Sequence, residues 1–229
     1  MKKLENEKYY NEFSKKYNNK RRAGSYLDYI NKTEISIIEP FIKKKKILEV
    51  GCGTGLILQE TQKKALEAIG IDISEKMLDL AKKNKLYVKK ANATSIPFPD
   101  NYFDVVYSFK VLPHIENIDL AIREMRRVTK KEGYLILEFY NPYSIKKITD
   151  TISGNNVYTR YDSIKKIKKM TKKHNIEIRK IYGIKIIILE LFSKIRIIKK
   201  IFLFLDKKLS LSMFKYFAGY IIIIAKNNE

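Results

Sequence analysis

Short apolar runs alternate with amphipathic stretches through the middle of the chain. The apolar runs have the length of strands and are bounded by turn residues, whereas the stretches between them repeat their apolar residues with helical spacing. This alternation predicts a doubly wound, mostly parallel α/β sheet with helices on both faces. The strands are expected at Ile47–Val50, Ile69–Ile73, Leu86–Lys89, Phe103–Ser108 and Gly133–Tyr140, and the helices at Glu75–Asn84 and about Leu120–Lys130.

The two ends of the chain differ from this middle part. The first 39 residues are predicted to form two helices, the second over Ser25–Glu39, before Pro40 and a lysine run lead into the first strand. After Pro142, two helices precede strands at Ile176–Ile184 and Gly219–Ala225, which brings the sheet to seven strands. Because no linker rich in Gly, Ser or Pro is evident, we expect a single domain with three parts: residues 1–42, 46–142 and 143–229.

The segment Lys185–Tyr216 combines dense Ile, Leu and Phe with a basic residue every few positions. It is expected to form a helical insertion before the last strand, with the lysine stems lying along the rim of an apolar face. Three interpretations stay open: a buried cap on the substrate side, a basic amphipathic surface that touches a membrane or lipid-like substrate, and a dimer interface.

The chain has 229 residues and a formal net charge of +22, and residues 143–229 hold 20 Lys or Arg against 6 Asp or Glu. Such a balance favours nucleic acid or an anionic membrane surface as a partner. However, Lys, Ile and Asn are frequent throughout the sequence, so compositional bias explains much of the charge. A single cysteine argues against a disulfide framework, and the longest apolar run near the end, Phe217–Ala225, is too short to span a bilayer. We therefore expect a cytoplasmic protein, with peripheral membrane contact left open.

The sharpest chemical signal is the sequence ILEVGCGTG, Ile47–Gly55. A buried strand ends here in a turn whose glycines, at 51, 53 and 55, permit positive φ angles and the close approach of a ligand. A dinucleotide fingerprint would need its third glycine at position 56, which is Leu56. Asp72 follows Gly51 by 21 residues at the end of the next strand, where a carboxylate can accept hydrogen bonds from ribose hydroxyls.

Four segments follow one another in the order and spacing of a motif set: Ile47–Gly55, Gly70–Lys82, Ala91–Ser108 and Glu124–Leu137. Together they resemble the motifs of class I S-adenosylmethionine-dependent methyltransferases. The branch most resembled includes the ubiquinone and menaquinone C-methyltransferases and many small-molecule enzymes. The resemblance covers about Lys46–Asn141 and implies S-adenosylmethionine as the cofactor.

The resemblance also implies roles for individual residues. Glu49 and the glycines would hold the methionine part of the cofactor, Asp72 the ribose, and Ile73 and Met77 the adenine. Asn92 stands where the family often has aspartate, and its side-chain oxygen can still accept from the adenine amine. The full set of expected cofactor contacts is Tyr17, Glu49, Gly51, Cys52, Gly53, Asp72, Ile73, Met77, Asn92, Ala93, Ser108 and Phe109.

His114 lies just past the fourth predicted strand and is the candidate catalytic residue, as a general base or as a group that orients the substrate. The alternative is a structural histidine, since many methyl transfers need no protein base. Tyr10, Phe13 and Tyr17 form an aromatic stripe that either belongs to a lid or packs on the sheet. Further candidates for the substrate side are Arg21, Arg22, Tyr140, Tyr158, Arg160 and Tyr161, with a helix expected over Thr159–Met170.

The sequence thus predicts methyl transfer to a small or lipophilic acceptor by a monomer or homodimer. A methyltransferase of tRNA or another nucleic acid is the alternative that the charge suggests, although no RNA-binding module is recognisable. A cofactor-binding regulator without catalysis is a second alternative. No cluster of His, Cys and Asp has the spacing of a metal site, and no specific nucleic-acid binding is expected.

Overall fold

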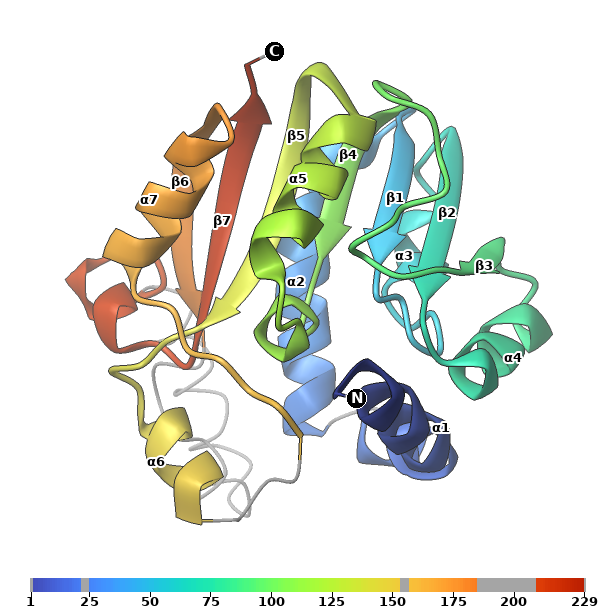
Figure 1. Ribbon diagram of the computed structural model, residues 1–229, viewed down its shortest axis with the longest axis horizontal. Helices are drawn as coiled ribbons and strands as arrows, with labels where there is room; N and C mark the ends of the chain where they lie inside the picture. Colours follow the sequence, from blue (N-terminus) through green and yellow to red (C-terminus); the bar gives the residue numbers. More distant parts are fainter. Residues whose placement is uncertain (1, 22–24, 153–156, 185–208, 229) are drawn as a thin grey trace.

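The computed structural model describes residues 2–21, 25–152, 157–184 and 209–228. Within these ranges, a seven-stranded sheet has the order β3-β2-β1-β4-β5-β7-β6 (Figure 1). The strand β7 pairs antiparallel with both of its neighbours, whereas the other pairs are parallel. The predicted α/β class and the mostly parallel sheet are therefore confirmed. The strands are β1 (Lys46–Val50), β2 (Glu67–Asp72), β3 (Val88–Lys90), β4 (Phe103–Ser108), β5 (Thr129–Tyr140), β6 (Ile176–Ile184) and β7 (Tyr220–Asn227).

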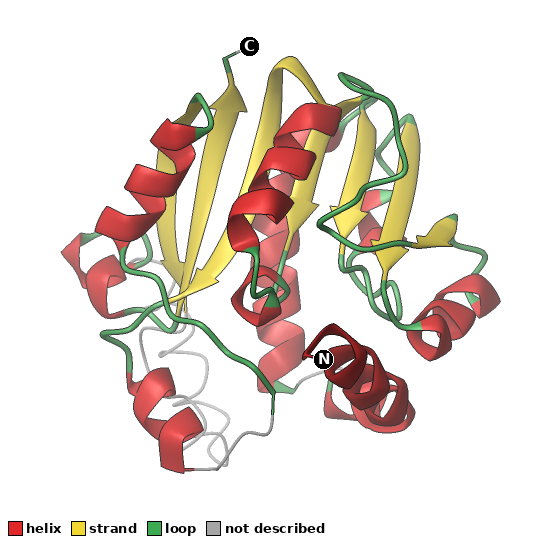
Figure 2. Ribbon diagram, in the orientation of Figure 1, coloured by secondary structure: helices red, strands yellow, loops and turns green. Residues whose placement is uncertain are grey.

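Helices cover both faces of the sheet (Figure 2). Apolar residues of α5 and α7 pack with one face, and those of α2 pack with the other. The helix α1 and the short helix α6 lie below the carboxyl ends of the parallel strands in the view of Figure 1. The helical elements are α1 (Lys2–Lys20), α2 (Tyr26–Ile42), α3 (Leu58–Thr61), α4 (Glu75–Lys83), η1 (Leu112–His114), α5 (Ile118–Val128), α6 (Ile145–Ile152), α7 (Ile164–Lys173) and η3 (Met213–Phe217).

The second helix runs further than its sequence suggests. We expected it to end at Glu39, before Pro40, but α2 continues through the proline to Ile42. A proline costs one backbone hydrogen bond in a helix. Here, Ile38 and Ile42 are fully buried in the core on either side of it, and this packing offsets the lost bond.

Several other boundaries differ from the prediction by one to three residues, and two differ by more. The strand β5 begins at Thr129 rather than Gly133, because Thr129 already pairs with Phe103 of β4 before the register shifts. The helix expected from Thr159 begins at Ile164, where the Ser163 side chain accepts from the Lys166 amide and caps it.

The expected helical insertion over Lys185–Tyr216 falls largely outside the described residues. Its described end contains a turn followed by η3. Among the described helices, none has the length and apolar character needed to cross a membrane.

Candidate active site

The glycine-rich turn directly follows β1 and has the backbone conformation expected for it. The φ angles are +78° at Gly51, +54° at Gly53 and +79° at Gly55, all in the left-handed region. A Cβ atom on Gly51 would also lie 2.1 Å from a methyl carbon of Val111, in the loop after β4. Both the conformation and the packing therefore require glycine at Gly51.

Asp72, the last residue of β2, is held beside this turn by backbone amides. Its Oδ2 accepts from the amide of Gly53 at 2.8 Å, and its Oδ1 accepts from the amide of Ser74 at 2.9 Å. Burial raises the pKa of Asp72, while these two hydrogen bonds oppose that rise. Each carboxylate oxygen can accept more than one hydrogen bond. Asp72 can therefore still accept hydrogen bonds from hydroxyl groups of a ligand.

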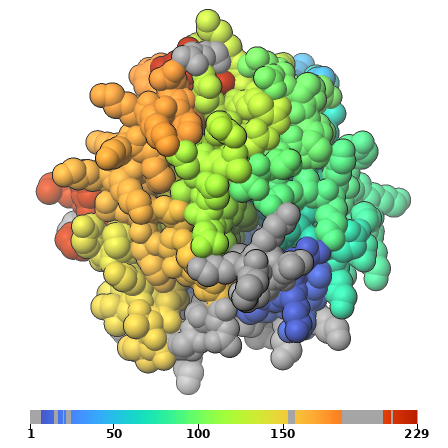
Figure 3. All heavy atoms as spheres, viewed as in Figure 1, coloured from blue at the N-terminus to red at the C-terminus, as the bar shows by residue number. Residues whose placement is uncertain are grey.

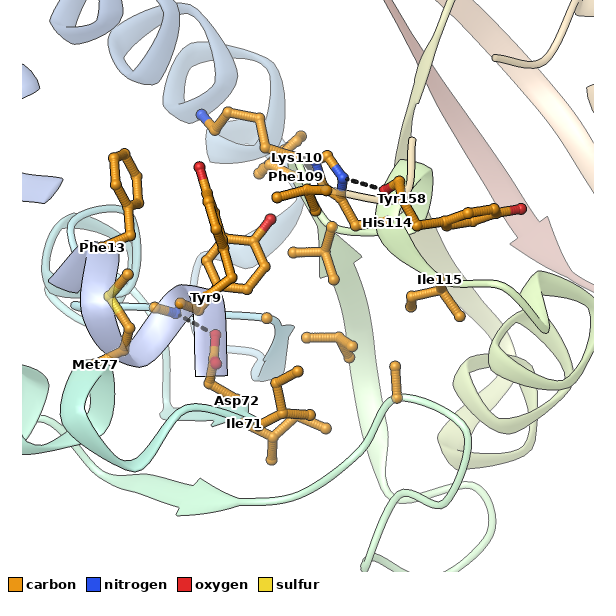
Figure 4. A pocket seen from close by; sticks show the side chains of 18 of the residues that line it. Tyr9, Phe13, Ile71, Asp72, Met77, Phe109, Lys110, His114, Ile115 and Tyr158 are labelled. Atoms are coloured by element: carbon orange, nitrogen blue, oxygen red, sulfur yellow. Dashed lines mark hydrogen bonds between the residues drawn. The ribbon is translucent and has the colours of Figure 1, made fainter. Parts of the chain in front are cut away.

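A cavity of about 440 Å³ opens at this edge of the sheet. Figure 4 shows side chains that line it from α1, the end of β2, α4 and the segment after β4. Ten of the residues predicted from the sequence line it: Tyr17, Gly51, Gly53, Asp72, Ile73, Met77, Asn92, Ala93, Phe109 and His114.

Three predicted cofactor contacts do not line this cavity. Glu49 is buried below it and accepts a 3.1 Å hydrogen bond from the Tyr107 hydroxyl. Cys52 packs with Leu58 and other apolar side chains between β2 and α4. Ser108 donates to the backbone oxygen of Val50 at 2.9 Å, joining β4 to β1. Glu49 and Ser108 lie in strands, where neighbouring side chains point to opposite faces, whereas Cys52 lies in the turn after β1.

The Glu49 carboxyl is in an apolar environment. Burial raises the pKa of Glu49 to about 8, although the hydrogen bond from Tyr107 opposes the rise. Glu49 thus holds its proton more tightly in the folded protein than an exposed carboxyl does, although the charge of Lys110 also opposes the rise. Its expected contact with the ammonium group of the cofactor stays a prediction.

The part of the cavity predicted to hold adenine is formed by Ile73, Met77, Asn92 and Ala93. The Oδ1 atom of Asn92 accepts from the amide of Thr94 at 3.1 Å, which fixes the side chain. This oxygen retains a second lone pair, so it can still accept from an exocyclic amine as the sequence suggested.

The aromatic stripe of α1 faces the cavity. Tyr10, Phe13 and Tyr17 line it, together with Tyr9, which the sequence analysis did not select. In Figure 3, α1 lies against the part of the chain that includes α4. The stripe therefore lies at the carboxyl ends of the parallel strands, where a lid would lie, and not against a face of the sheet.

Polar contacts attach α1 to the cofactor side of the cavity. Asn11 Oδ1 accepts from the Ser74 hydroxyl at 2.7 Å, and Asn18 Oδ1 accepts from the Thr54 hydroxyl at 2.7 Å. An ion pair of 2.7 Å joins Glu7 and Lys90.

His114 lies at the opposite end of the cavity from Asp72, beside Tyr140 and Tyr158 (Figure 4). Its Nδ1 lies 2.9 Å from the backbone oxygen of Tyr158. Because a carbonyl oxygen only accepts, this contact places the proton on Nδ1 and leaves Nε2 as the acceptor nitrogen. Burial lowers the pKa of His114, which favours the neutral imidazole.

The other substrate-side candidates divide into two groups. Arg21, Tyr140 and Tyr158 line the cavity. Arg160 instead forms an ion pair with Asp162, and the Tyr161 hydroxyl donates to Asp150 at 2.6 Å, so both contribute to local structure. Arg22 lies outside the described residues.

Two lysines that the sequence analysis did not select also line the cavity. Lys110 follows β4 with a φ of +60°, and Lys146 lies on α6. Nothing in a lysine-rich sequence distinguishes these two from the many solvated ones. In the described part of the chain, no group of three or more His, Cys, Asp or Glu side chains could hold a metal ion.

The arrangement around Gly51, Gly53 and Asp72 fits S-adenosylmethionine. The glycine turn permits close approach of the methionine part, Asp72 offers acceptors to the ribose, and Ile73 and Met77 offer apolar contact to the adenine. Bound there, the cofactor supplies a methyl group on a positively charged sulfur.

Comparison with known proteins finds similarity to methyltransferases. Residues 48–137 match the methyltransferase domain family model. An uncharacterized protein of Methanocaldococcus jannaschii is 35% identical over 175 residues, which cover 76% of this chain and 64% of that protein. A ubiquinone biosynthesis O-methyltransferase of Pelagibacter ubique is 28% identical over 165 residues, covering 65% of this chain and 68% of that protein. The matched region thus spans just under two thirds of the Methanocaldococcus protein.

Among solved structures, a methyltransferase of Thermotoga maritima described as a possible histamine N-methyltransferase has the same fold. Its TM-score is 0.73 at 17% identity, and the match covers 95% of this chain and 97% of that one. The fold, the glycine turn with Asp72 and the matched family model agree: residues 48–137 are similar to a methyltransferase domain, the sheet has the α/β fold of the Thermotoga methyltransferase, and this similarity implies S-adenosyl-L-methionine as the cofactor.

Proposed function

We propose that this chain transfers the methyl group of S-adenosylmethionine to a small, lipophilic acceptor. The observation that carries the proposal is the division of one cavity into two ends. One end contains Gly51, Gly53 and Asp72, and the other is walled by Tyr140, Tyr220 and further apolar side chains. A site of this composition suits an acceptor with an apolar body.

The acceptor end is enclosed by rings in mutual contact. The Tyr140 ring lies 5.6 Å from the His114 ring and 5.2 Å from that of Tyr220, measured between centroids. Tyr140 and Tyr220 are nearly fully buried, at 7% and 5% exposure. Rigid rings orient a flat or apolar acceptor at low entropic cost, and positioning is the main contribution a protein makes to such a transfer.

The quinone-related branch supports the same acceptor class. The Pelagibacter relative is named for ubiquinone biosynthesis, and it is 28% identical to this chain. We infer a lipophilic acceptor from the cavity and take this relationship as additional support.

A transfer experiment tests the proposal. The protein is incubated with S-adenosylmethionine labelled on its methyl group and, separately, with an organic-solvent extract of cells, bulk tRNA and total protein. We expect label in the organic extract, and less of it with an Asp72→Ala variant at a cofactor concentration that does not saturate the variant. Label in tRNA or protein, with none in the organic extract, contradicts the proposal.

A further inference from the structure

Arg21 directly follows α1, and its side chain lines the cavity. The carbon of its guanidinium group lies 3.9 Å from the centroid of the Tyr17 ring, which is about one helical turn earlier in the chain. The Tyr17 ring lies beside the glycine turn, since a Cβ atom on Gly53 would be 3.8 Å from the Tyr17 hydroxyl oxygen. This stack brings a positive charge to the side of the cavity that contains the glycine turn.

Hydrogen bonds hold the backbone of Arg21 beside the same turn. The Arg21 amide donates to the backbone oxygen of Asn18 at 3.0 Å. The Asn18 side-chain oxygen accepts from the Thr54 hydroxyl at 2.7 Å, and Thr54 is fully buried in the glycine turn. The residues just before Arg21 are therefore attached to the turn, and the guanidinium group stays close to it.

Among the described residues, no carboxylate forms an ion pair with Arg21, and its Nε atom is buried without a hydrogen-bond partner. The two lysines that line the cavity differ from it. Lys146 pairs with Asp150 and Lys110 pairs with Glu34, and neither carboxylate lines the cavity. A buried donor without a partner is costly. Arg21 is therefore suited to a negative group that a ligand brings.

The glycine turn itself offers few donors to such a group. The amides of Gly51 and Cys52 both donate to the backbone oxygen of Ile71, at 2.7 and 3.0 Å. The Gly53 amide donates to Asp72 at 2.8 Å. Each backbone amide has one proton to donate, so these three are used within the protein. The turn permits close approach of a ligand, but a negative group must find its donors elsewhere.

The implied cofactor has one negative group, the carboxylate of its methionine part. The ammonium group and the sulfur beside this carboxylate are both positive. An ionised carboxylate that enters a buried site needs a counter-charge, and Asp72, expected at the ribose, is itself negative. A guanidinium group suits the role, because its N–H groups match the geometry of a carboxylate.

We propose that Arg21 pairs with the carboxylate of the methionine part of S-adenosylmethionine, and that the Tyr17 ring holds the guanidinium group in place. Arg21 is then a cofactor-binding residue and Tyr17 a positioning residue. This rests on the cofactor of the proposed function and not on its acceptor. Since Arg21 follows α1 directly, the same contact attaches the lid to the bound cofactor.

Titration calorimetry tests this with two ligands: S-adenosylhomocysteine and its decarboxylated analogue, which keeps the ammonium group and the adenosine. We expect wild type to bind S-adenosylhomocysteine more tightly than the analogue, by about tenfold or more. Arg21→Gln should lose most of this preference, because only its affinity for S-adenosylhomocysteine falls. Unchanged binding of the analogue shows at the same time that the variant is folded.

Two further comparisons separate a direct contact from a structural effect. Tyr17→Phe keeps the stacked ring and should keep the preference, whereas Tyr17→Leu should reduce it. Arg123→Gln removes the same charge from an exposed position of α5 that does not line the cavity, and it should leave both affinities unchanged.

The role of Arg21 is overturned if wild type shows no preference, if Arg21→Gln keeps the full preference, or if this variant binds both ligands equally less tightly. A full preference together with weaker methyl transfer in Arg21→Gln would place the contact with a carboxylate of the acceptor instead. The role of Tyr17 is overturned if Tyr17→Leu keeps the full preference. A failure of the proposed function is distinct, because no label then reaches the organic extract while the preference for S-adenosylhomocysteine persists.

Discussion

The backbone amide of Gly53 donates a 2.8 Å hydrogen bond to the Asp72 carboxylate and thereby couples the ends of β1 and β2. A second donation, from the Ser74 amide, fixes the other oxygen of the same carboxylate. The residue expected to bind ribose is therefore held in position before any ligand arrives. Such preorganisation lowers the entropic cost of binding.

Replacing Asp72 should weaken cofactor binding. In Asp72→Ala, the ribose hydroxyls lose their acceptor, and we expect the affinity for S-adenosylhomocysteine to fall by about 1–3 kcal/mol. Titration calorimetry measures the change, and Asp79→Ala, at an exposed position of α4, is the matched control. NAD should not bind, because the turn lacks a glycine at position 56. Unchanged affinity in Asp72→Ala would remove this carboxylate from the site.

Features that a local sequence pattern determines were predicted correctly, whereas features that depend on tertiary packing were not. Strands β4 and β6 have the predicted bounds because apolar runs and turn residues mark their ends locally. The extension of α2 past Pro40 depends on Ile42 reaching the core, which is a tertiary effect. The glycine turn and Asp72 could be predicted because their spacing is characteristic.

The acceptor end was harder to predict. Lys110 and Lys146 resemble every other lysine in the sequence, and only the fold shows that carboxylates behind the wall orient them toward the cavity. Glu49 was recognised from its motif, but its burial under the cavity and its bond to Tyr107 arise from strand pairing. Local sequence contains no information of that kind.

The buried Glu49 should make stability depend on pH. Its pKa is raised by burial to about 8, above the ordinary value of 4.5, so between these values the folded state binds more protons than the unfolded state. The free energy of unfolding should therefore fall as pH rises through this window. A Glu49→Gln variant should lack this contribution and gain stability relative to wild type as pH rises. Urea unfolding at several pH values tests this; an equal pH dependence in both proteins would contradict it.

The ion pair between Glu34 and Lys110 should be costly to break. Glu34 is fully buried and Lys110 is 12% exposed, so Glu34→Gln removes the carboxylate that contacts a desolvated ammonium and leaves the buried Glu138 as the carboxyl beside it. We expect a loss of about 3–5 kcal/mol in the free energy of unfolding, measured in urea. Glu60→Gln, which breaks the exposed pair with Lys63, should cost about 0–1 kcal/mol. Similar losses in the two variants would show that burial does not govern the difference.

The contacts of α1 predict a lid that controls ligand release. Asn11→Ala removes the acceptor for the Ser74 hydroxyl, a contact worth about 1 kcal/mol. Dissociation of S-adenosylhomocysteine should therefore become several-fold faster, as measured by filter binding of labelled ligand after dilution. Asn19→Ala, at an exposed position of the same helix, should leave the rate unchanged. Equal rates in all three proteins would mean that α1 does not limit release.

The basic surface of α7 should bind nucleic acid weakly and without specificity. This helix presents Lys165, Lys168, Lys169 and Lys172 to solvent, on the side away from the core. Lysine contacts to phosphate act mainly by releasing counterions, so their affinity falls steeply with salt. We expect binding of a labelled tRNA at low ionic strength to disappear at physiological salt, and a random RNA of equal length to behave alike. The positive charge of the chain would then reflect its lysine-rich composition. This result would be consistent with a small acceptor that binds in the aromatic cavity. Salt-resistant binding that prefers tRNA, reduced when these four lysines are replaced by glutamine, would instead favour a nucleic-acid substrate.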